Sequence, residues 1–324
     1  IFQIFKILLR NMFKYLFAST IIVALATYQV FGTDTKCTTQ ACRSPFAFYH
    51  EAYPNFPSET DNLFVQTFDG KTNFQLDPDA QLTAWDGSKR TAEEHFDWMK
   101  RHIIQYAKAD APGFVKEGEI DGVIWENHVE LTNKHRNVGY FRLRATVDVD
   151  PKTFASLMAD PHKLFAMDDT VRIMDFSRTP KYTSNVQGKR KVWLAYFRQA
   201  PGGILPDLDG VDVSGYEVQS DGTVVQASIG MPNVLPNFKG DWYPKAFRSW
   251  DMHWGYTLKP INNGKSSELV LICQHDLRNW MVPISLANRM VGQTLADYVR
   301  TAEKVGQGLV ATGQAPGLRE LHGL

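Results

Sequence analysis

Three aspartates stand close together in the segment PDLDGVD, where carboxylate oxygens at short spacing suggest a metal-ion loop. They are Asp207, Asp209 and Asp212. An EF-hand calcium loop also needs a glycine at a fixed offset and a bidentate glutamate at its twelfth position; here the glycine falls elsewhere and no such glutamate follows. The three cysteines show no C-x-x-C spacing and no nearby histidine pair. We therefore interpret the segment as a solvated acidic turn and predict no metal and no cofactor.

Candidates for catalysis are few. Asp168 and Asp169 form an acidic pair between a predicted helix and a predicted strand, where surface charge explains them. His253 alternates with large apolar residues on a predicted strand, and a lone histidine there is more often outward-facing or hydrogen-bonded than a general base. The common hydrolase, zinc-protease and nucleotide-binding motifs do not occur in the sequence. The sequence thus predicts no catalytic residue and no enzyme.

The elements around His253 are the best defined in the chain. Residues 250–258 alternate between apolar side chains and polar or small ones, which is the period of a strand buried on one face. Asn262, Asn263 and Gly264 suit a hairpin turn because they tolerate positive φ, and ELVLICQHDL returns as a second strand. After Pro283, apolar residues recur at spacings of three and four to Ala302, so an amphipathic helix must lie on a sheet.

This region resembles the START (steroidogenic acute regulatory protein-related lipid transfer) domain family. The resemblance rests on GYTLKP and the strand that ends at Asp276, on MVPISLANRMVGQTLADYV as a closing helix, and on TVVQASIGMPNVLP upstream. It implies an α+β helix-grip fold, in which a curved antiparallel sheet of about nine strands wraps a long C-terminal helix around a lipid-sized tunnel. Many members carry an Arg-Asp pair where this chain reads DLDGVDVSGYEV, so a ligand from any one subfamily does not carry over.

Strand alternation and helix spacing together select the residues that would line such a tunnel. Met252, Trp254 and Tyr256 share one strand face, and we predict that they lie opposite Met290 and Tyr298 of the closing helix.

A sixth candidate, Arg144, alternates with apolar residues on a predicted central strand together with Arg142. On the outer face both arginines would be solvated. Turned inward, a guanidinium would bind a lipid phosphate, carboxylate or hydroxyl, or would pair with a buried acid such as Asp175 or Glu126.

Further elements complete the predicted domain. Thr91 and Glu94 form a capping box at the start of a helix, and the order that follows is three strands, two short helices, six strands and the closing helix. The predicted lipid-binding domain is 91–308, followed by a flexible tail at 309–324. Between two strands, residues 231–247 hold three prolines and several aromatic residues beside lysines. We predict membrane contact there, through Leu235, Phe238, Lys239, Trp242 and Tyr243; the alternative is that this loop plugs the tunnel.

The first 90 residues carry a different signal. An apolar run from Leu16 to Ala26 follows Lys14 and ends in the pattern Ala24-x-Ala26, which is typical of a cleaved signal peptide. The alternative is an uncleaved anchor over Tyr15 to Gly32. We predict a signal peptide or membrane anchor at 1–32 and an irregular, proline-broken arm at 33–90. These features predict the secretory lumen or the extracellular space, or an anchored position on a membrane, including that of an organelle.

The charge of the chain limits the classes of binding partner that we expect. Lys+Arg and Asp+Glu both total 35, and no long basic run would follow a phosphate backbone, so nucleic acid is not an expected partner. The sequence therefore predicts a protein that binds a sterol, phospholipid or other apolar ligand and transfers it between membrane surfaces without chemistry. Two alternatives remain. One is an accessory subunit of a membrane protein complex that keeps the lipid-binding fold. The other is a helix-grip cyclase or hydrolase.

Overall fold

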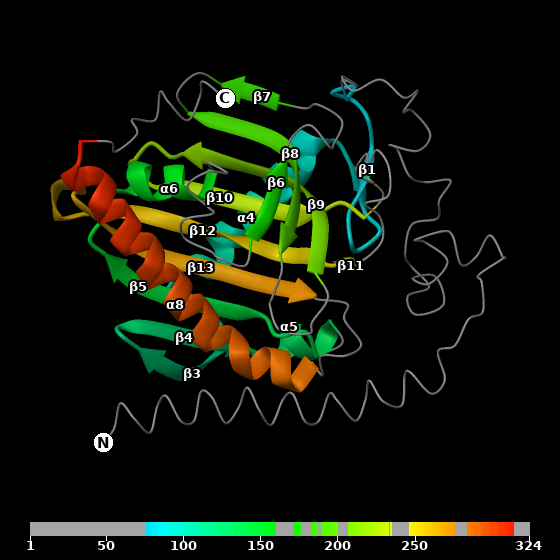
Figure 1. Cartoon of the computed structure of the whole chain (residues 1–324). Helices are drawn as coiled ribbons and strands as arrows, with labels where there is room; N and C mark the ends of the chain where they lie inside the picture. Colours follow the sequence, from blue (N-terminus) through cyan, green and yellow to red (C-terminus); the bar gives the residue numbers. More distant parts are fainter. Residues whose placement is uncertain are drawn as a thin grey trace, which may run out of the picture. The chain divides into compact units, whose positions relative to one another are not determined.

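The computed structural model describes residues 76–135, 137–159, 171–175, 183–186, 189–199, 207–232, 234, 246–276 and 284–313. They form one eleven-stranded sheet in the order β3-β4-β5-β13-β12-β10-β9-β8-β6, with β7 beside β8 and β11 beside β9 (Figure 1). Every pairing in this sheet is antiparallel except β11 with β9. The strands are β3 (Phe114–Ile120), β4 (Val123–His128), β5 (Phe141–Val147), β6 (Val171–Asp175), β7 (Thr183–Val186), β8 (Arg190–Gln199), β9 (Asp207–Val218), β10 (Val224–Gly230), β11 (Ala246–Arg248), β12 (Trp250–Ile261) and β13 (Ser266–Asp276).

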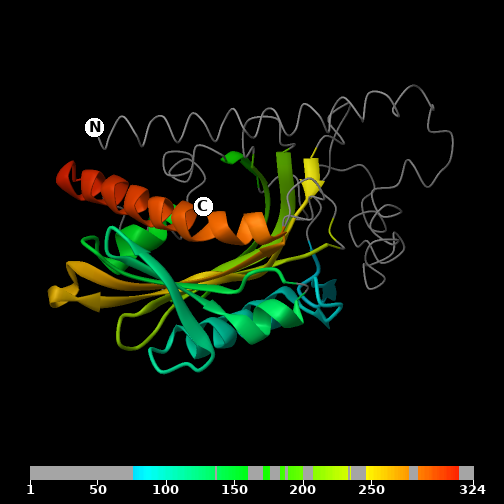
Figure 2. The ribbon, with the colours of Figure 1, turned by 90° about the horizontal axis from the view of Figure 1, so that it is seen from below.

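Helices cover both faces of this sheet. The long C-terminal α8 (Ile284–Ala311) crosses one face, and α4 (Ala92–Ala107) lies on the other (Figure 2). Two shorter helices are α5 (Val129–Lys134) and α6 (Pro151–Ala159). The predicted α+β class and the long helix across an antiparallel sheet are confirmed. The sheet has eleven strands instead of about nine because β7 and β11 are short strands that alternation over longer windows does not reveal.

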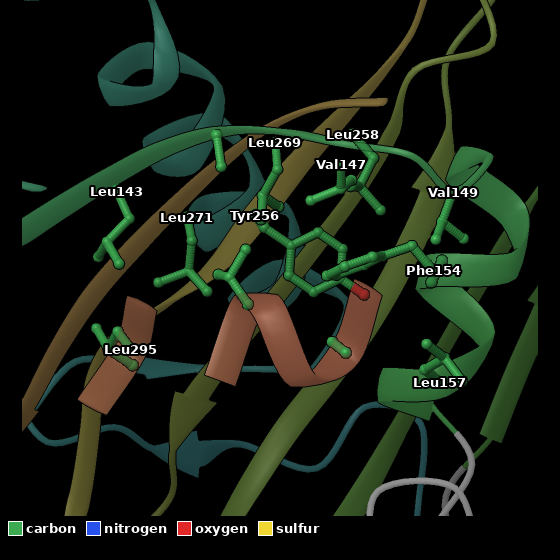
Figure 3. Packing of buried hydrophobic residues seen from close by; sticks show 14 of the residues in the cluster. Leu143, Val147, Val149, Phe154, Leu157, Tyr256, Leu258, Leu269, Leu271 and Leu295 are labelled. Atoms are coloured by element: carbon green, nitrogen blue, oxygen red, sulfur yellow. The ribbon is translucent and has the colours of Figure 1, made fainter. Parts of the chain in front are cut away.

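The strands send alternate side chains to two cores, because a sheet covered on both sides must bury both of its faces. Toward α8, which defines the α8 face, Leu143, Tyr256 and Leu271 pack with Leu295 of the helix and Phe154 of α6 (Figure 3). Toward α4, which defines the α4 face, one cluster joins residues of the sheet to one side of that helix. Its members include Val213, Ala227, Ile272, Phe96, Met99 and Ile103.

The predicted hairpin and capping box are both present. Asn262, Asn263 and Gly264 have positive φ in the short turn η3 (Asn262–Gly264), and β12 pairs with β13 on either side of it. Thr91 accepts a hydrogen bond from the Glu94 amide, and the Glu94 carboxylate accepts one from the Thr91 amide. Both features depend on residues a few positions apart, so local sequence is enough to specify them.

Two predicted boundaries need correction. Residues 76–90 are not an irregular arm but part of the α4-side core, where Leu76, Leu82 and Ala84 are buried and β1 (Leu82–Thr83) pairs with β2 (Lys89–Arg90). Helix α8 runs to Ala311, past the predicted start of the tail at 309. Residues 1–75 lie outside the described part. Within the described ranges, no helix is long and apolar enough to cross a membrane.

The α4 face contains a group of stacked histidines. The rings of His102 and His253 lie 4.3 Å apart and nearly parallel. His102 Nε2 is 2.7 Å from the Tyr140 hydroxyl, and His253 Nδ1 is 2.7 Å from Gln274 Oε1. Burial lowers the pKa of His102 from 6.5 to about 4 and holds the pKa of His253 well below its usual value. His253 is therefore buried and hydrogen-bonded, as one of its two predicted alternatives stated.

These histidines should make the domain sensitive to acid. Because their pKa values are lowered by folding, the unfolded chain binds protons more readily, and stability present above pH 6.5 is lost as the pH falls toward 4. His102 alone should account for about 2 kcal/mol between pH 7.5 and pH 5. When the pH falls from 7.5 to 5, the free energy of unfolding should therefore decrease by about 2 kcal/mol less in His102→Gln than in the parent. Denaturant unfolding at the two pH values measures this difference. An equal pH-dependent loss in both proteins would contradict the assignment.

Candidate functional site

The α8 face is divided into an apolar part and a polar part. Leu143, Leu269 and Leu271 form apolar surface near α8. Across β8, β9, β10 and β12 the same face carries polar side chains, because these positions alternate with the valines, alanine and isoleucine of the α4-side core. This polar set comprises Lys191, Asp212, Ser214, Tyr216, Gln226, Ser228, Asp251, Tyr256 and, on β13, His275.

Part of the polar set forms a connected chain of hydrogen bonds. Ser214 Oγ lies 2.8 Å from Ser228 Oγ, and Ser228 donates to Asp212 Oδ2 at 3.2 Å. The carboxyl groups of Asp212 and Asp251 interact, and Asp251 Oδ1 lies 2.5 Å from Nδ1 of His275. The chain therefore connects four strands, β9, β10, β12 and β13, across one face of the sheet.

A β-bulge brings Asp251 into this chain. The pairing of β12 with β13 shifts between Asp251 and His253, so that Asp251 is opposite His275 while His253 is opposite Gln274. Strict alternation would put Asp251 on the same face as His253; the extra residue of the bulge instead lets the two side chains face opposite sides. His275 follows Leu271 and Cys273 at intervals of two, and this alternation is the signal that identifies its face.

The interpretation of PDLDGVD as a solvated acidic turn is wrong. Residues 207–218 form β9, and Asp209 and Asp212 are 2% and 5% exposed. Asp209 accepts a hydrogen bond from the Tyr196 hydroxyl, and Asp212 accepts one from Ser228. Polarity alone assigns this acidic segment to a turn. It can form a buried strand because its aspartates have hydrogen-bond partners inside the protein.

The pKa shifts of Asp251 and His275 favour an ionic pair. Burial by itself would lower the pKa of His275, but the Asp251 carboxylate more than offsets this and raises it. Burial would likewise raise the pKa of Asp251, yet the facing imidazolium lowers it. An aspartate that orients a histidine is also suited to general-base catalysis. However, Nε2 of this histidine has no hydrogen-bonded serine, threonine or cysteine among the described residues. The pair is therefore better suited to donating a hydrogen bond than to activating a nucleophile.

Four polar atoms on the α8 face are buried without a hydrogen-bond partner in the described structure. They are Trp193 Nε1, Gln226 Oε1, the Tyr256 hydroxyl and His275 Nε2. An unsatisfied buried polar atom costs on the order of 1–3 kcal/mol, so each one calls for an explanation. His95 Nδ1 on the α4 face is a further such atom among the described residues. The concentration on one face indicates a place where a bound molecule would supply the missing partners.

The residues predicted to line the tunnel differ in where the structure places them. Tyr256 is 1% exposed in the α8-side core, and the rings of Trp254 and Tyr298 lie 6.4 Å apart across the sheet–helix contact. Met252 is buried at the bulge, where its carbonyl accepts a hydrogen bond from Trp85 Nε1. Met290 is 53% exposed, so the expectation that it faces the sheet is contradicted. The apolar stripe of α8 is broad, and the spacing of its residues does not show which edge of the stripe faces β12.

Arg144 also lies away from the expected tunnel. It occupies the α4 face with Arg142, and its Nη2 is 3.0 Å from Glu126 Oε1. Arg142 is buried, lies 2.6 Å from Glu126 Oε2, and donates to the carbonyls of Tyr106 and Lys108 at the end of α4. Arg142 therefore holds the end of α4 to the sheet, whereas Arg144 pairs with Glu126 within the sheet, and the orientation of Arg144 toward the tunnel is contradicted. The pairing with Glu126, which the sequence analysis left open, is present.

Two further predictions have different outcomes. The membrane-contact residues Leu235, Phe238, Lys239, Trp242 and Tyr243 lie outside the described residues, so that assignment stays a prediction. In the described parts of the chain, no group of three or more His, Cys, Asp or Glu side chains could hold a metal ion.

Comparison with known proteins identifies the fold. No family model matches the sequence, and no curated protein does. The structure is similar to human STARD10, with a TM-score of 0.53 and 14% identity over 67% of this chain and 82% of that one. It is also similar to the human StAR-related lipid transfer protein 5, with a TM-score of 0.54 and 13% identity over 67% and 97%. The chain therefore has a START-like helix-grip fold, as the sequence resemblance predicted.

The charge on His275 should depend on Asp251. We expect Asp251→Asn to lower the pKa of His275 to below that of an exposed histidine, because burial then acts without a facing carboxylate. NMR titration of the histidine ring protons, with a His275→Gln sample to assign the signal, measures this shift. Glu268→Gln, which removes an exposed charge from the same strand, should leave the titration unchanged. An unaltered His275 pKa in Asp251→Asn would show that the pair is not ionic.

Proposed function

We propose that this protein binds an apolar lipid between the α8 face of the sheet and α8, and that it transfers the lipid between membranes without a covalent step. The observation that carries the proposal is the composition of that face, which joins apolar surface to four buried polar atoms that lack partners. A lipid matches this combination, because it offers a large apolar body and a small polar end. The START-like fold, shared with a lipid transfer protein, supports the same function.

The energetics follow from burial. Each Å² of acyl or sterol surface that leaves water contributes about 25 cal/mol, so most of the affinity would come from the apolar body. The polar atoms would contribute little net affinity but would fix the orientation of the lipid, since a misplaced polar end would leave them unsatisfied. Binding would then be selective for the polar end and tolerant of the apolar chain.

The attachment of α8 indicates where the lipid would pass. Asn288 accepts a hydrogen bond from the Gly139 amide, and Arg300 donates to the carbonyls of Asp121 and Thr146. Gly292 lies so close to Trp125 that a side chain there would clash with the indole. All of these contacts are with β3, β4, β5 or the turns beside them. The helix is thus fixed along that side, and its C-terminal part also packs on α6, where Gly306 lies against Val149 and Leu157. We place lipid access on the remaining side, toward β9 and β10.

The remaining steps of the proposal concern the membrane. The predicted loop is corrected at its two ends, because Met231 and Val234 are buried in the α4-side core and residues 246–247 belong to β11. Residues 235–245 are proposed to contact the bilayer during exchange, since aromatic residues beside lysines suit the lipid headgroup region. A secretory or membrane-anchored location is proposed on the basis of the apolar segment within residues 1–32.

Truncation of side chains on α8 tests the proposed site. Tyr298 is half-buried against Trp254, whereas Met290 on the same helix is exposed. We expect Tyr298→Ala to reduce severalfold the lipid that the full chain extracts from vesicles of mixed phospholipid, cholesterol and diacylglycerol, measured by mass spectrometry of the reisolated protein. Met290→Ala should extract as much as the parent. Equal extraction by all three proteins, with melting temperatures unchanged, would place the lipid elsewhere.

A further inference from the structure

Two of the four unpartnered atoms belong to neighbouring residues. Gln226 of β10 and Tyr256 of β12 are directly opposite each other in the sheet, and both side chains point to the α8 face. Side chains in such a pair start about 5 Å apart, so one small group on a ligand can reach both. The Tyr256 ring packs with Phe154 of α6, and Figure 3 shows its oxygen beyond the ring, away from the strand.

The hydrogen-bonding character of the two atoms restricts the ligand. Burial raises the pKa of Tyr256, so its hydroxyl stays protonated and can donate as well as accept. In the amide orientation of the structure, Gln226 Oε1 can only accept, so its missing partner must supply a donor. Ester and ether oxygens have no donor and would leave Gln226 unsatisfied. A hydroxyl satisfies both atoms, since it accepts from Tyr256 and donates to Gln226.

The surroundings of the pair exclude a charged group. The residues next to it on the same face are uncharged: Tyr216, Val224, Ser228, Trp254, Leu258 and Leu271. Lys191 on this face is opposite Tyr216, one strand farther away, and has its Nζ 5.9 Å from the centre of the Trp193 ring. The other charged groups of this face, Asp212, Asp251 and His275, lie beyond Ser228. Burying a phosphate or carboxylate beside Tyr256 and Gln226 would therefore cost several kcal/mol without a direct counter-charge.

We propose that the ligand is an uncharged lipid whose polar end is a hydroxyl group, held between Gln226 and Tyr256. This inference rests on the proposed function and specifies the class of lipid. It explains why a buried tyrosine keeps a hydroxyl that no described protein group satisfies, at a position where phenylalanine would fill the same space.

Matched lipid pairs test the inference. The delipidated full chain is incubated with phosphatidylcholine vesicles that contain cholesterol or its 3-O-methyl ether, 1,2-dioleoylglycerol or its 3-O-methyl ether, or dioleoyl phosphatidic acid. Bound lipid is quantified by mass spectrometry. We expect the free hydroxyl of at least one pair to be taken up about tenfold more than its ether, because the ether lacks the donor. Phosphatidic acid should not be preferred.

Two variants test the residues themselves. Tyr256→Phe and Gln226→Met should each reduce the uptake of the hydroxyl lipid to about the level of its methyl ether. The melting temperature of the unloaded protein should stay the same or rise, since each change removes an atom that has no partner. Ser267→Ala is the control. Ser267 lies on the same face but donates to the Val149 carbonyl at 2.7 Å, so its loss should lower the melting temperature and leave lipid selectivity intact.

The outcomes separate this inference from the proposed function. Equal uptake of a hydroxyl lipid and its ether, a preference for phosphatidic acid, or full selectivity in both variants would overturn the inference and leave lipid binding in place. A clear loss of stability in unloaded Tyr256→Phe would overturn it too, because the hydroxyl would then have a partner in the protein. Failure to take up any of the five lipids would contradict the proposed function as well.

Discussion

The sheet is buried on both faces, and the rest of the structure depends on this constraint. Every side chain of its central strands must enter either the core against α4 or the core against α8, so polar residues cannot be sent to water on one side. Each buried polar group must therefore find a partner in the protein or in a ligand. The two faces meet this requirement in different ways.

Apart from His95 Nδ1, the polar groups named on the α4 face find their partners within the protein. Glu126 is bound by Arg142 and Arg144, His253 contacts Gln274, and His102 contacts Tyr140. These contacts fasten α4 and the sheet into a rigid platform, at the cost of keeping histidines uncharged. The α8 face meets the requirement only in part. Its chain from Ser214 to His275 is connected, yet other polar atoms beside it lack partners. One face is thus suited to support and the other to binding.

The same division explains how α8 is held. Its polar contacts and its closest approach to the sheet are with β3, β4, β5 and their turns, whereas the polar set of the α8 face lies mainly on the strands from β8 to β12. A helix fixed along one side of a sheet can cover a ligand without sealing it in. Strong attachment and ligand exchange therefore use different parts of the same element.

The sequence by itself determined the features that depend on neighbouring residues. The capping box at Thr91, the turn at Asn262–Gly264 and the alternation of Trp254, Tyr256 and Leu258 are all specified within a few positions. The helix-grip fold was predicted from the resemblance to the START family. Only the tertiary structure decided which face each polar residue occupies. Periodicity shows that Arg142 and Arg144 share a face, but it does not show which helix covers that face.

The same limit applies to the candidate site. Asp251 reaches the α8 face through a single bulge, Asp212 is buried in a segment that reads as an acidic turn, and Met290 lies on the exposed side of α8. Each outcome depends on partners far away in the sequence. The spacing of apolar residues indicates which positions are buried. Which residues they pack against depends on how the sheet and helices assemble.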